Sequence, residues 1–191
     1  FTMKELQSIF SLDKINKSGA KFDFEKAKWF NHEHIKKISD ESLLKFLNKN
    51  IDKKYLEAID KKSKNKLIEL IKNRVIFKKD IIKETRNILD PDYQILDQNF
   101  IQKKWNKKIN SSIIEIINFI KSSNNIPIDE IKKSKLEILN KNEIKIGDGM
   151  QSLRLCLIKT PVGPDIFEII KILGVKESIN RFNNNLMEIN G

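Results

Sequence analysis

Two arginines occupy positions from which hydrogen-bond donors could reach a nucleic acid. Arg154 interrupts an apolar run, and Gly163 and Pro164 follow it as the expected start of another helix. Pro164 suits the first helical position, since its missing N–H costs nothing there. A helix N-terminus presents free N–H groups and positive potential. Arg154 beside such an end predicts a nucleic-acid site.

The second arginine, Arg74, lies at the joint between two expected helices, after Lys72 and before Lys78. A side chain at a joint projects from a rigid support. A guanidinium fork can donate to both N3 and O2 of a splayed cytosine, and unstacked loop bases are the part of RNA that proteins read by sequence. On the residues alone, a solvated arginine is the simpler interpretation.

Helices are expected throughout the chain, because glycine and proline are scarce, at 6 and 4, and apolar residues recur at helical spacing. In the first half, helices are predicted to begin at Asp23, at Ser39 or Asp40, at Asp52, at Ser63 and at Phe77. Short connections between short helices predict compact bundles.

The second half continues the helical pattern over residues 97–106, and Asn110 is the expected cap of the next helix. Another helix is expected to start at Pro127 or Asp129, and its lysines, Lys132, Lys133 and Lys135, to lie on a solvated surface. Residues 147–149 are predicted to form a turn. Gly174 is expected to end a helix in a left-handed cap, before a last helix over residues 176–189.

Several side chains are assigned structural roles. Core packing is the expectation for Phe22 and Trp29, and Cys156, the single cysteine, is expected to be a buried, inert thiol. His32 and His34 are two residues apart and point in different directions on a helix, so they do not form a metal pair. No other cluster has metal-ligand spacing, and no metal site is predicted.

Composition favours a polyanionic partner, because the net charge is +11 and the pI about 9.6. The abundance of Lys, Asn and Ile is also typical of AT-rich coding sequence, so part of the charge is compositional. No run of apolar residues is long enough to span a membrane.

The order of motifs near the C-terminal end resembles the C-terminal anticodon-binding region of bacterial-type glutamyl-tRNA synthetases. The matching residues are Leu153-Arg154, Leu157-Ile158, Gly163-Pro164, Ile172-Leu173-Gly174 and Arg181. Lys159-Thr160 departs from the usual Thr-Gly of the family. Nearer the start, Phe22-Asp23, Lys26, Trp29 and Asn31 resemble the family's stem-contact segment.

The resemblance implies an all-α fold in which helical bundles form an α-helix cage for the anticodon. It divides the chain into a partial stem-contact segment at 1–42, a first anticodon-binding subdomain at 43–95 and a second at 96–191. It also implies site residues. Arg74 and Arg154 would contact bases, with Gly163, Pro164 and Ile166 in the pocket wall, while Lys72, Lys78 and Lys159 would contact the RNA backbone.

The implied function is recognition of the anticodon arm of glutamate tRNA by part of a glutamate–tRNA ligase. The His-x-Gly-His and Lys-Met-Ser-Lys-Ser motifs of a class I catalytic domain do not occur, so this chain should be inactive alone. ATP and Mg²⁺ would serve the full-length enzyme. No cofactor is expected in this chain, which starts without an initiator Met and is expected to be a fragment.

A cytoplasmic monomer without membrane contact is expected. Two alternatives remain open, a nonspecific basic RNA-binding helical domain and a helical protein-interaction module. Whether the parent enzyme also charges glutamine tRNA stays undecided, although an arginine at position 74 indicates strict reading of the third anticodon base.

Overall fold

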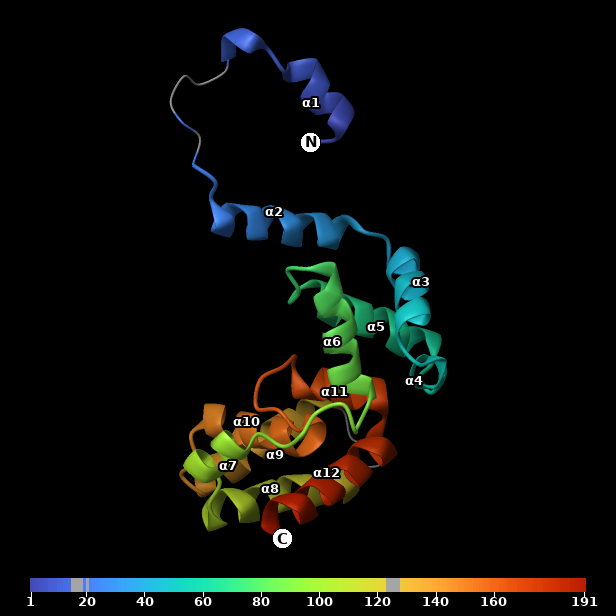
Figure 1. The fold of residues 1–191 in the computed structure, drawn as a ribbon. Coiled ribbons are helices and arrows are strands. Elements are labelled where there is room, and N and C mark those ends of the chain that lie inside the picture. The colour runs from blue at the N-terminus through green and yellow to red at the C-terminus, as the bar shows by residue number, and fades with distance from the viewer. Residues whose placement is uncertain (15–18, 20, 123–127) are drawn as a thin grey trace.

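The structure is a computed structural model that describes residues 1–14, 19, 21–122 and 128–191. Regular structure within these ranges is helical and is arranged along an elongated molecule (Figure 1). The α-helices are α1 (Met3–Ile9), α2 (Phe24–Lys37), α3 (Asp40–Asn50), α4 (Lys53–Glu57), α5 (Lys61–Lys72), α6 (Lys78–Leu89), α7 (Gln98–Lys104), α8 (Lys107–Ser122), α9 (Ile128–Lys141), α10 (Ile146–Ile158), α11 (Ile166–Leu173) and α12 (Val175–Asn190). A 3₁₀ helix covers Leu12–Lys14. The predicted all-α class is confirmed.

Side-chain caps begin most of the helices. Asp23, Ser39 and Asp52 each accept a backbone N–H of the first turn, as predicted. Two expected starts are wrong. Asp60 caps α5 by accepting from the Ser63 N–H at 2.7 Å, and α8 begins before Asn110. In both places an earlier polar side chain supplies the acceptor that the first turn needs.

The turn expected at residues 147–149 is also wrong, because these residues form the first turns of α10. Gly149 is buried against α9, where an added Cβ would lie 2.5 Å from a methyl carbon of Leu139. The lack of a side chain at Gly149 therefore allows α9 and α10 to approach each other closely. The proposed helix start at Pro127 lies outside the described residues.

A single hydrophobic cluster extends from Ile35 on α2 to Leu186 on α12. Helix α5 packs on α11, α10 packs on α12, and α8 packs on α9. Cys156 is buried inside this core, as predicted, and burial raises the pKa of its thiol. The α5–α11 contact joins the helices that precede residue 95 to those that follow it.

Arg181 makes a second connection between the two halves. Its side chain is buried on α12, and its guanidinium donates to the carbonyl oxygens of Ile88 at 2.7 Å and Leu89 at 2.9 Å. Its Nε donates to Glu177 at 2.7 Å. Arg181 thereby satisfies carbonyl groups that the end of α6 leaves without helical partners.

The aromatic side chains at the start of α2 do not enter the core. Phe22 is 68% exposed and Trp29 is 58% exposed, so the expectation that they pack inside is wrong. Helix α2 buries Ile35 near its C-terminal end, while its first turns project away from the bundle (Figure 1). Helix α1 contains no buried residue.

Candidate nucleic-acid interface

The joint between α5 and α6 presents Arg74 to solvent. Helix α5 ends at Lys72, and the Arg74 N–H donates to the Ile71 carbonyl at 2.9 Å to close the last turn. The exposed side chain lines a surface hollow of about 310 Å³ that it shares with Trp29 and His32 of α2. The predicted position at a helix joint is confirmed.

Two side chains of α2 fix the backbone of this joint. The Asn31 amide donates to the Ile76 carbonyl. His32 lies with Nδ1 2.7 Å from the Val75 carbonyl oxygen, so Nδ1 carries the proton and donates. Hydrogen bonds to consecutive carbonyls leave the segment after Arg74 little freedom, and Arg74 therefore projects from a fixed support.

Arg154 lies half-buried on α10 and holds the turn that connects α10 to α11. Its Nε donates to the Pro164 carbonyl at 3.0 Å, and its Nη1 donates to the Pro161 carbonyl at 2.8 Å. Burial lowers the pKa of the Arg154 guanidinium, the positive charge of Arg74 lowers it further, and Asp165 opposes both effects. The charge of Arg74 thus reaches Arg154, although the two residues are 80 positions apart in the sequence.

The turn itself is packed closely against Arg154. A Cβ added to Gly163 would lie 2.9 Å from Cδ of Arg154 and 3.1 Å from Cδ1 of Ile158. Pro164 is buried, and the Ile166 side chain is 1% exposed in the core. Val162, which the sequence analysis did not single out, is 67% exposed beside them and offers the apolar surface of this turn.

The start of α11 differs from the prediction. The helix begins at Ile166 with Asp165 as its cap, two residues later than the predicted start at Pro164. Asp165 Oδ1 accepts from the N–H groups of Phe167 at 2.9 Å and Glu168 at 3.2 Å. These two N–H groups are therefore occupied, and the expectation that they are free is wrong.

The lysines proposed for backbone contact have partners within the protein. Lys72 pairs with Asp40 at 2.6 Å, and Lys159 pairs with Glu188 at 3.2 Å. Lys78 is exposed, with its ammonium 4.5 Å from the ring centroid of Phe46. Of the three, Lys78 keeps the greatest access to solvent.

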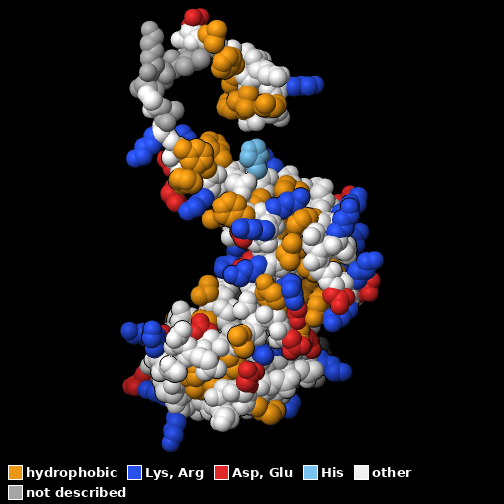
Figure 2. Space-filling view, in the orientation of Figure 1, with side chains coloured by type: hydrophobic (Ala, Val, Ile, Leu, Met, Phe, Trp, Pro, Cys, Tyr) orange, Lys and Arg blue, Asp and Glu red, His pale blue; other side chains and the backbone are white. Residues whose placement is uncertain are grey.

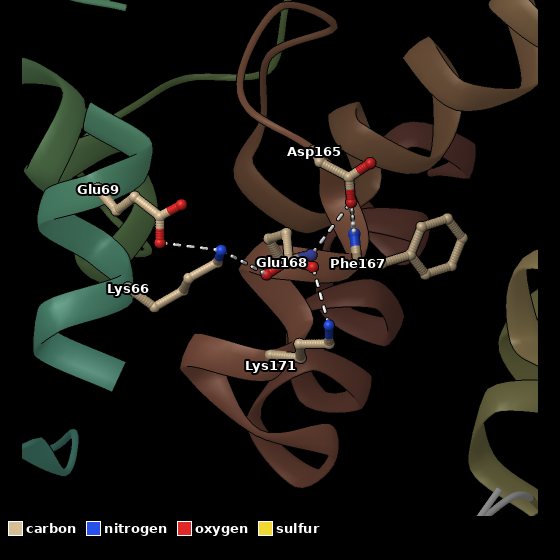
Figure 3. A network of polar contacts seen from close by, with 6 residues as sticks. All are labelled: Lys66, Glu69, Asp165, Phe167, Glu168 and Lys171. Atoms are coloured by element: carbon tan, nitrogen blue, oxygen red, sulfur yellow. Dashed lines mark hydrogen bonds and ion pairs between the residues drawn. The ribbon is translucent and has the colours of Figure 1, made fainter. Parts of the chain in front are cut away.

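An ion-pair network ties α5 to α11 (Figure 3). Lys66 of α5 lies 3.0 Å from Glu69 and 3.6 Å from Glu168 of α11. Glu168 also accepts from Lys171 at 2.8 Å, and this hydrogen bond is the main reason that the pKa of Glu168 is lowered. The network holds the middle of α5 near the start of α11.

The lysines of α9 differ from one another in their surroundings. Lys133 is exposed, as predicted. Lys135 is only 7% exposed and lies with its ammonium 5.2 Å from the ring centroid of Phe167, so the expectation of a solvated side chain is wrong for it. Helical spacing within α9 could not reveal the burial of Lys135, because the Phe167 ring beside it comes from α11.

Lys and Arg side chains gather around the concave side of the molecule between α2 and the α10–α11 turn (Figure 2). Across the described ranges, no group of three or more His, Cys, Asp or Glu side chains could hold a metal ion. None of the described helices is both long and apolar enough to cross a membrane. The arrangement offers guanidinium and ammonium donors for an anionic, base-bearing ligand.

Comparison with protein families matches residues 24–186 to the anticodon binding domain. The chain is 30% identical over 181 residues to the glutamate–tRNA ligase of Amoebophilus asiaticus (strain 5a2), covering 95% of this chain and 35% of that protein. It is 33% identical to the glutamate–tRNA ligase of Azobacteroides pseudotrichonymphae, covering 95% and 36%. The chain thus spans about a third of the length of these relatives.

Solved structures of glutamate–tRNA ligases also resemble this chain. The chain superposes on a glutamate tRNA ligase from Elizabethkingia meningosepticum, solved in complex with its amino acid, with a TM-score of 0.77 and 28% identity. The match covers 99% of this chain and 37% of that one. A glutamate-tRNA synthetase from Elizabethkingia anophelis matches with a TM-score of 0.70 and 26% identity.

Proposed function

Because the chain belongs to the anticodon binding domain family, we propose that it binds the anticodon arm of glutamate tRNA as part of a glutamate–tRNA ligase. The names of its relatives support the identity of the tRNA. The observation that carries the proposal is that Arg74, exposed at the α5–α6 joint, lies near enough to Arg154 beside the α10–α11 turn for its charge to lower the pKa of Arg154.

In this proposal the two arginines have different tasks. Arg74 is exposed on a fixed joint and donates to the third anticodon base. Arg154 uses two of its donors to hold the turn and directs its remaining N–H groups toward the RNA. Gly163 allows a close approach to the turn, and Pro164 and Ile166 support it from the core side.

Lysines on the same surface supply affinity without sequence information, as phosphate contacts do. Lys78 contributes in its observed position, and Lys72 and Lys159 contribute by exchanging their carboxylate partners for phosphate. Because 50–200 mM salt screens such contacts, affinity should fall by about 0.7 to 0.9 log units per log unit of salt for each contact.

The same proposal covers the whole protein. Residues 1–42 form part of a stem-contact segment, and residues 43–95 and 96–191 form two anticodon-binding subdomains. The catalytic reaction, with ATP and Mg²⁺, belongs to the portion that the longer relatives possess, so this chain alone attaches no glutamate. We also propose that the protein is cytoplasmic and that it is a monomer. Light scattering of the purified chain would test the oligomeric state.

Filter binding tests the proposal with glutamate tRNA and the same tRNA changed at its third anticodon base. The expected result is tighter binding of the unchanged tRNA, and loss of that preference in Arg74→Ala. Arg86→Ala is the matched control, because Arg86 is partly exposed and its guanidinium is engaged by Asp90 and Tyr93. This control should keep the preference.

Other outcomes favour the alternatives. Equal binding of both tRNAs, with the same salt dependence, would indicate a nonspecific RNA-binding domain. An absence of binding at about 50 mM salt, where phosphate contacts are strong, would favour a protein-interaction module. The exposed aromatic residues Phe22, Phe24 and Trp29 provide a surface for such a module.

A further inference from the structure

Two lysines of α9 converge on one aromatic ring of α11. Lys132 and Lys135 lie one helical turn apart and share a face of the helix. Their ammonium nitrogens lie 5.8 Å and 5.2 Å from the ring centroid of Phe167. The ring attracts both cations through its quadrupole but carries no net charge. The two positive charges therefore add on this side of the molecule.

Among the residues whose side chains the structure describes, no acidic group lies at ion-pair distance from either lysine. This differs from the neighbouring network, in which Lys66 and Lys171 both reach Glu168. Lys135 is only 7% exposed, and a buried charge without a counter-charge is energetically costly. Burial lowers the pKa of Lys135, Lys132 adds to this effect, and Asp165 opposes it.

Asp165 is the acidic group whose charge reaches Lys135, and it already has other partners. Its carboxylate caps α11 through the N–H groups of Phe167 and Glu168 (Figure 3). It also attracts the guanidinium of Arg154. The Asp165 carboxylate thus attracts cations on both α9 and α10, and positive charge remains in excess near the start of α11.

We propose that Lys132 and Lys135 bind a backbone phosphate of the RNA strand whose bases meet Arg74 and Arg154. This inference rests on the proposed function. An anionic phosphate oxygen would compensate both ammonium groups, which act as compact point charges. Phe167, whose ring both ammonium groups approach, follows Pro164 by three residues, and the Pro164 carbonyl accepts from Arg154, so the lysine pair lies next to the turn that Arg154 holds.

The test compares charge removal inside the pair with charge removal next to it. Lys135→Met and Lys132→Gln each remove one cation, and the exposed Lys133→Met is the matched control on the same helix. Binding to glutamate tRNA is measured between about 50 and 200 mM salt. We expect the slope of log affinity against log salt to become shallower by about 0.7 for each lost contact in the two pair variants. Lys133→Met should keep the wild-type slope.

Lys135→Arg keeps the charge and should restore most of the slope. Lys132→Gln decides the question independently of the buried Lys135, because Lys132 is only half-buried. Equal slopes for Lys132→Gln, Lys133→Met and the wild type would overturn the proposal, and so would a wild-type chain that binds no tRNA.

The two proposals fail in different ways. Loss of base preference in Arg74→Ala, together with unchanged slopes in the lysine variants, would leave the anticodon proposal intact and overturn the phosphate site. Shallower slopes in the lysine variants, without any base preference in the wild type, would support the phosphate site and overturn the anticodon proposal. In a further arm, inorganic phosphate replaces chloride at constant ionic strength. Weaker tRNA binding in the wild type but not in Lys132→Gln would show that the pair also accepts the free ion.

Discussion

Arg154 and Pro164 are joined by a hydrogen bond of 3.0 Å from the arginine Nε to the proline carbonyl, and a second bond reaches Pro161. The side chain proposed to meet RNA is therefore also the support of the turn beside it. Its orientation is set before any ligand arrives, which lowers the entropy lost on binding.

Arg154→Lys should uncouple these roles, because an ammonium group cannot reproduce the planar fork. We expect tRNA affinity to fall, and the free energy of unfolding to drop by about 1–2 kcal/mol through the loss of charge-assisted hydrogen bonds. Urea unfolding and amide exchange at Val162 and Gly163 would measure this. Unchanged exchange at both amides would show that Arg154 does not hold the turn.

Gly163→Ala should disturb the same contact from the other side, because the new Cβ would lie 2.9 Å from Cδ of Arg154. We expect weaker tRNA binding with a small loss of stability. Gly147→Ala is the matched control, since its added Cβ meets nothing within 4 Å. At that helical position alanine should be neutral or stabilise by up to about 1 kcal/mol. Equal tRNA affinity of the two variants would contradict the prediction.

Gly174 should resist substitution for a backbone reason. It joins α11 to α12 with φ 79° and ψ 157°, a conformation that is almost restricted to glycine. Gly174→Ala should therefore lower the free energy of unfolding by about 1–3 kcal/mol, although no atom obstructs the new methyl group. Thermal unfolding beside Gly147→Ala is the measurement, and equal melting temperatures would contradict it.

Arg181→Ala should be strongly destabilising, since it removes the donors to the Ile88 and Leu89 carbonyls inside the core. Unsatisfied buried acceptors cost about 1–3 kcal/mol each, so a loss of about 2–6 kcal/mol is expected for the two carbonyls. Lys176→Ala, exposed on the same helix, should change stability little. Urea unfolding of both variants checks the difference.

Lys135 should make stability depend on alkaline pH. Its pKa is lowered from 10.5 by burial, so the unfolded chain binds the proton more tightly than the folded chain. The cost of the buried charge is fully present below the folded pKa and disappears as the pH rises past the unfolded value. Lys135→Met should thus be more stable than the wild type at neutral pH. Urea unfolding should show this advantage shrinking toward about pH 10.5, and a constant advantage would contradict the assignment.

Sequence reasoning succeeded where a local signal decides the structure. The caps at Asp23 and Ser39 and the joint at Arg74 are set by residues a few positions apart. It failed where contacts with another helix determine the environment of a residue. Lys135 is buried by a ring of α11, and Gly149 is required by a side chain of α9. Neither neighbour can be identified from helical spacing alone.

The candidate site shows the same limit. The residue types and the turn at Gly163 were predictable, but the electrostatic coupling of Arg154 to Arg74 depends on how α5 packs against α11. Asp165 displaced Pro164 as the start of α11, because its carboxylate can accept two N–H groups and a proline can accept none.

The contact between Arg181 and the end of α6 has a consequence for synthesis on the ribosome. The Ile88 and Leu89 carbonyls emerge long before the guanidinium that will bond them, which is 93 and 92 positions later in the chain. Until then the end of α6 must rely on water, and the nascent first half remains incompletely closed. Completion of this fold is therefore delayed until α12 has been translated.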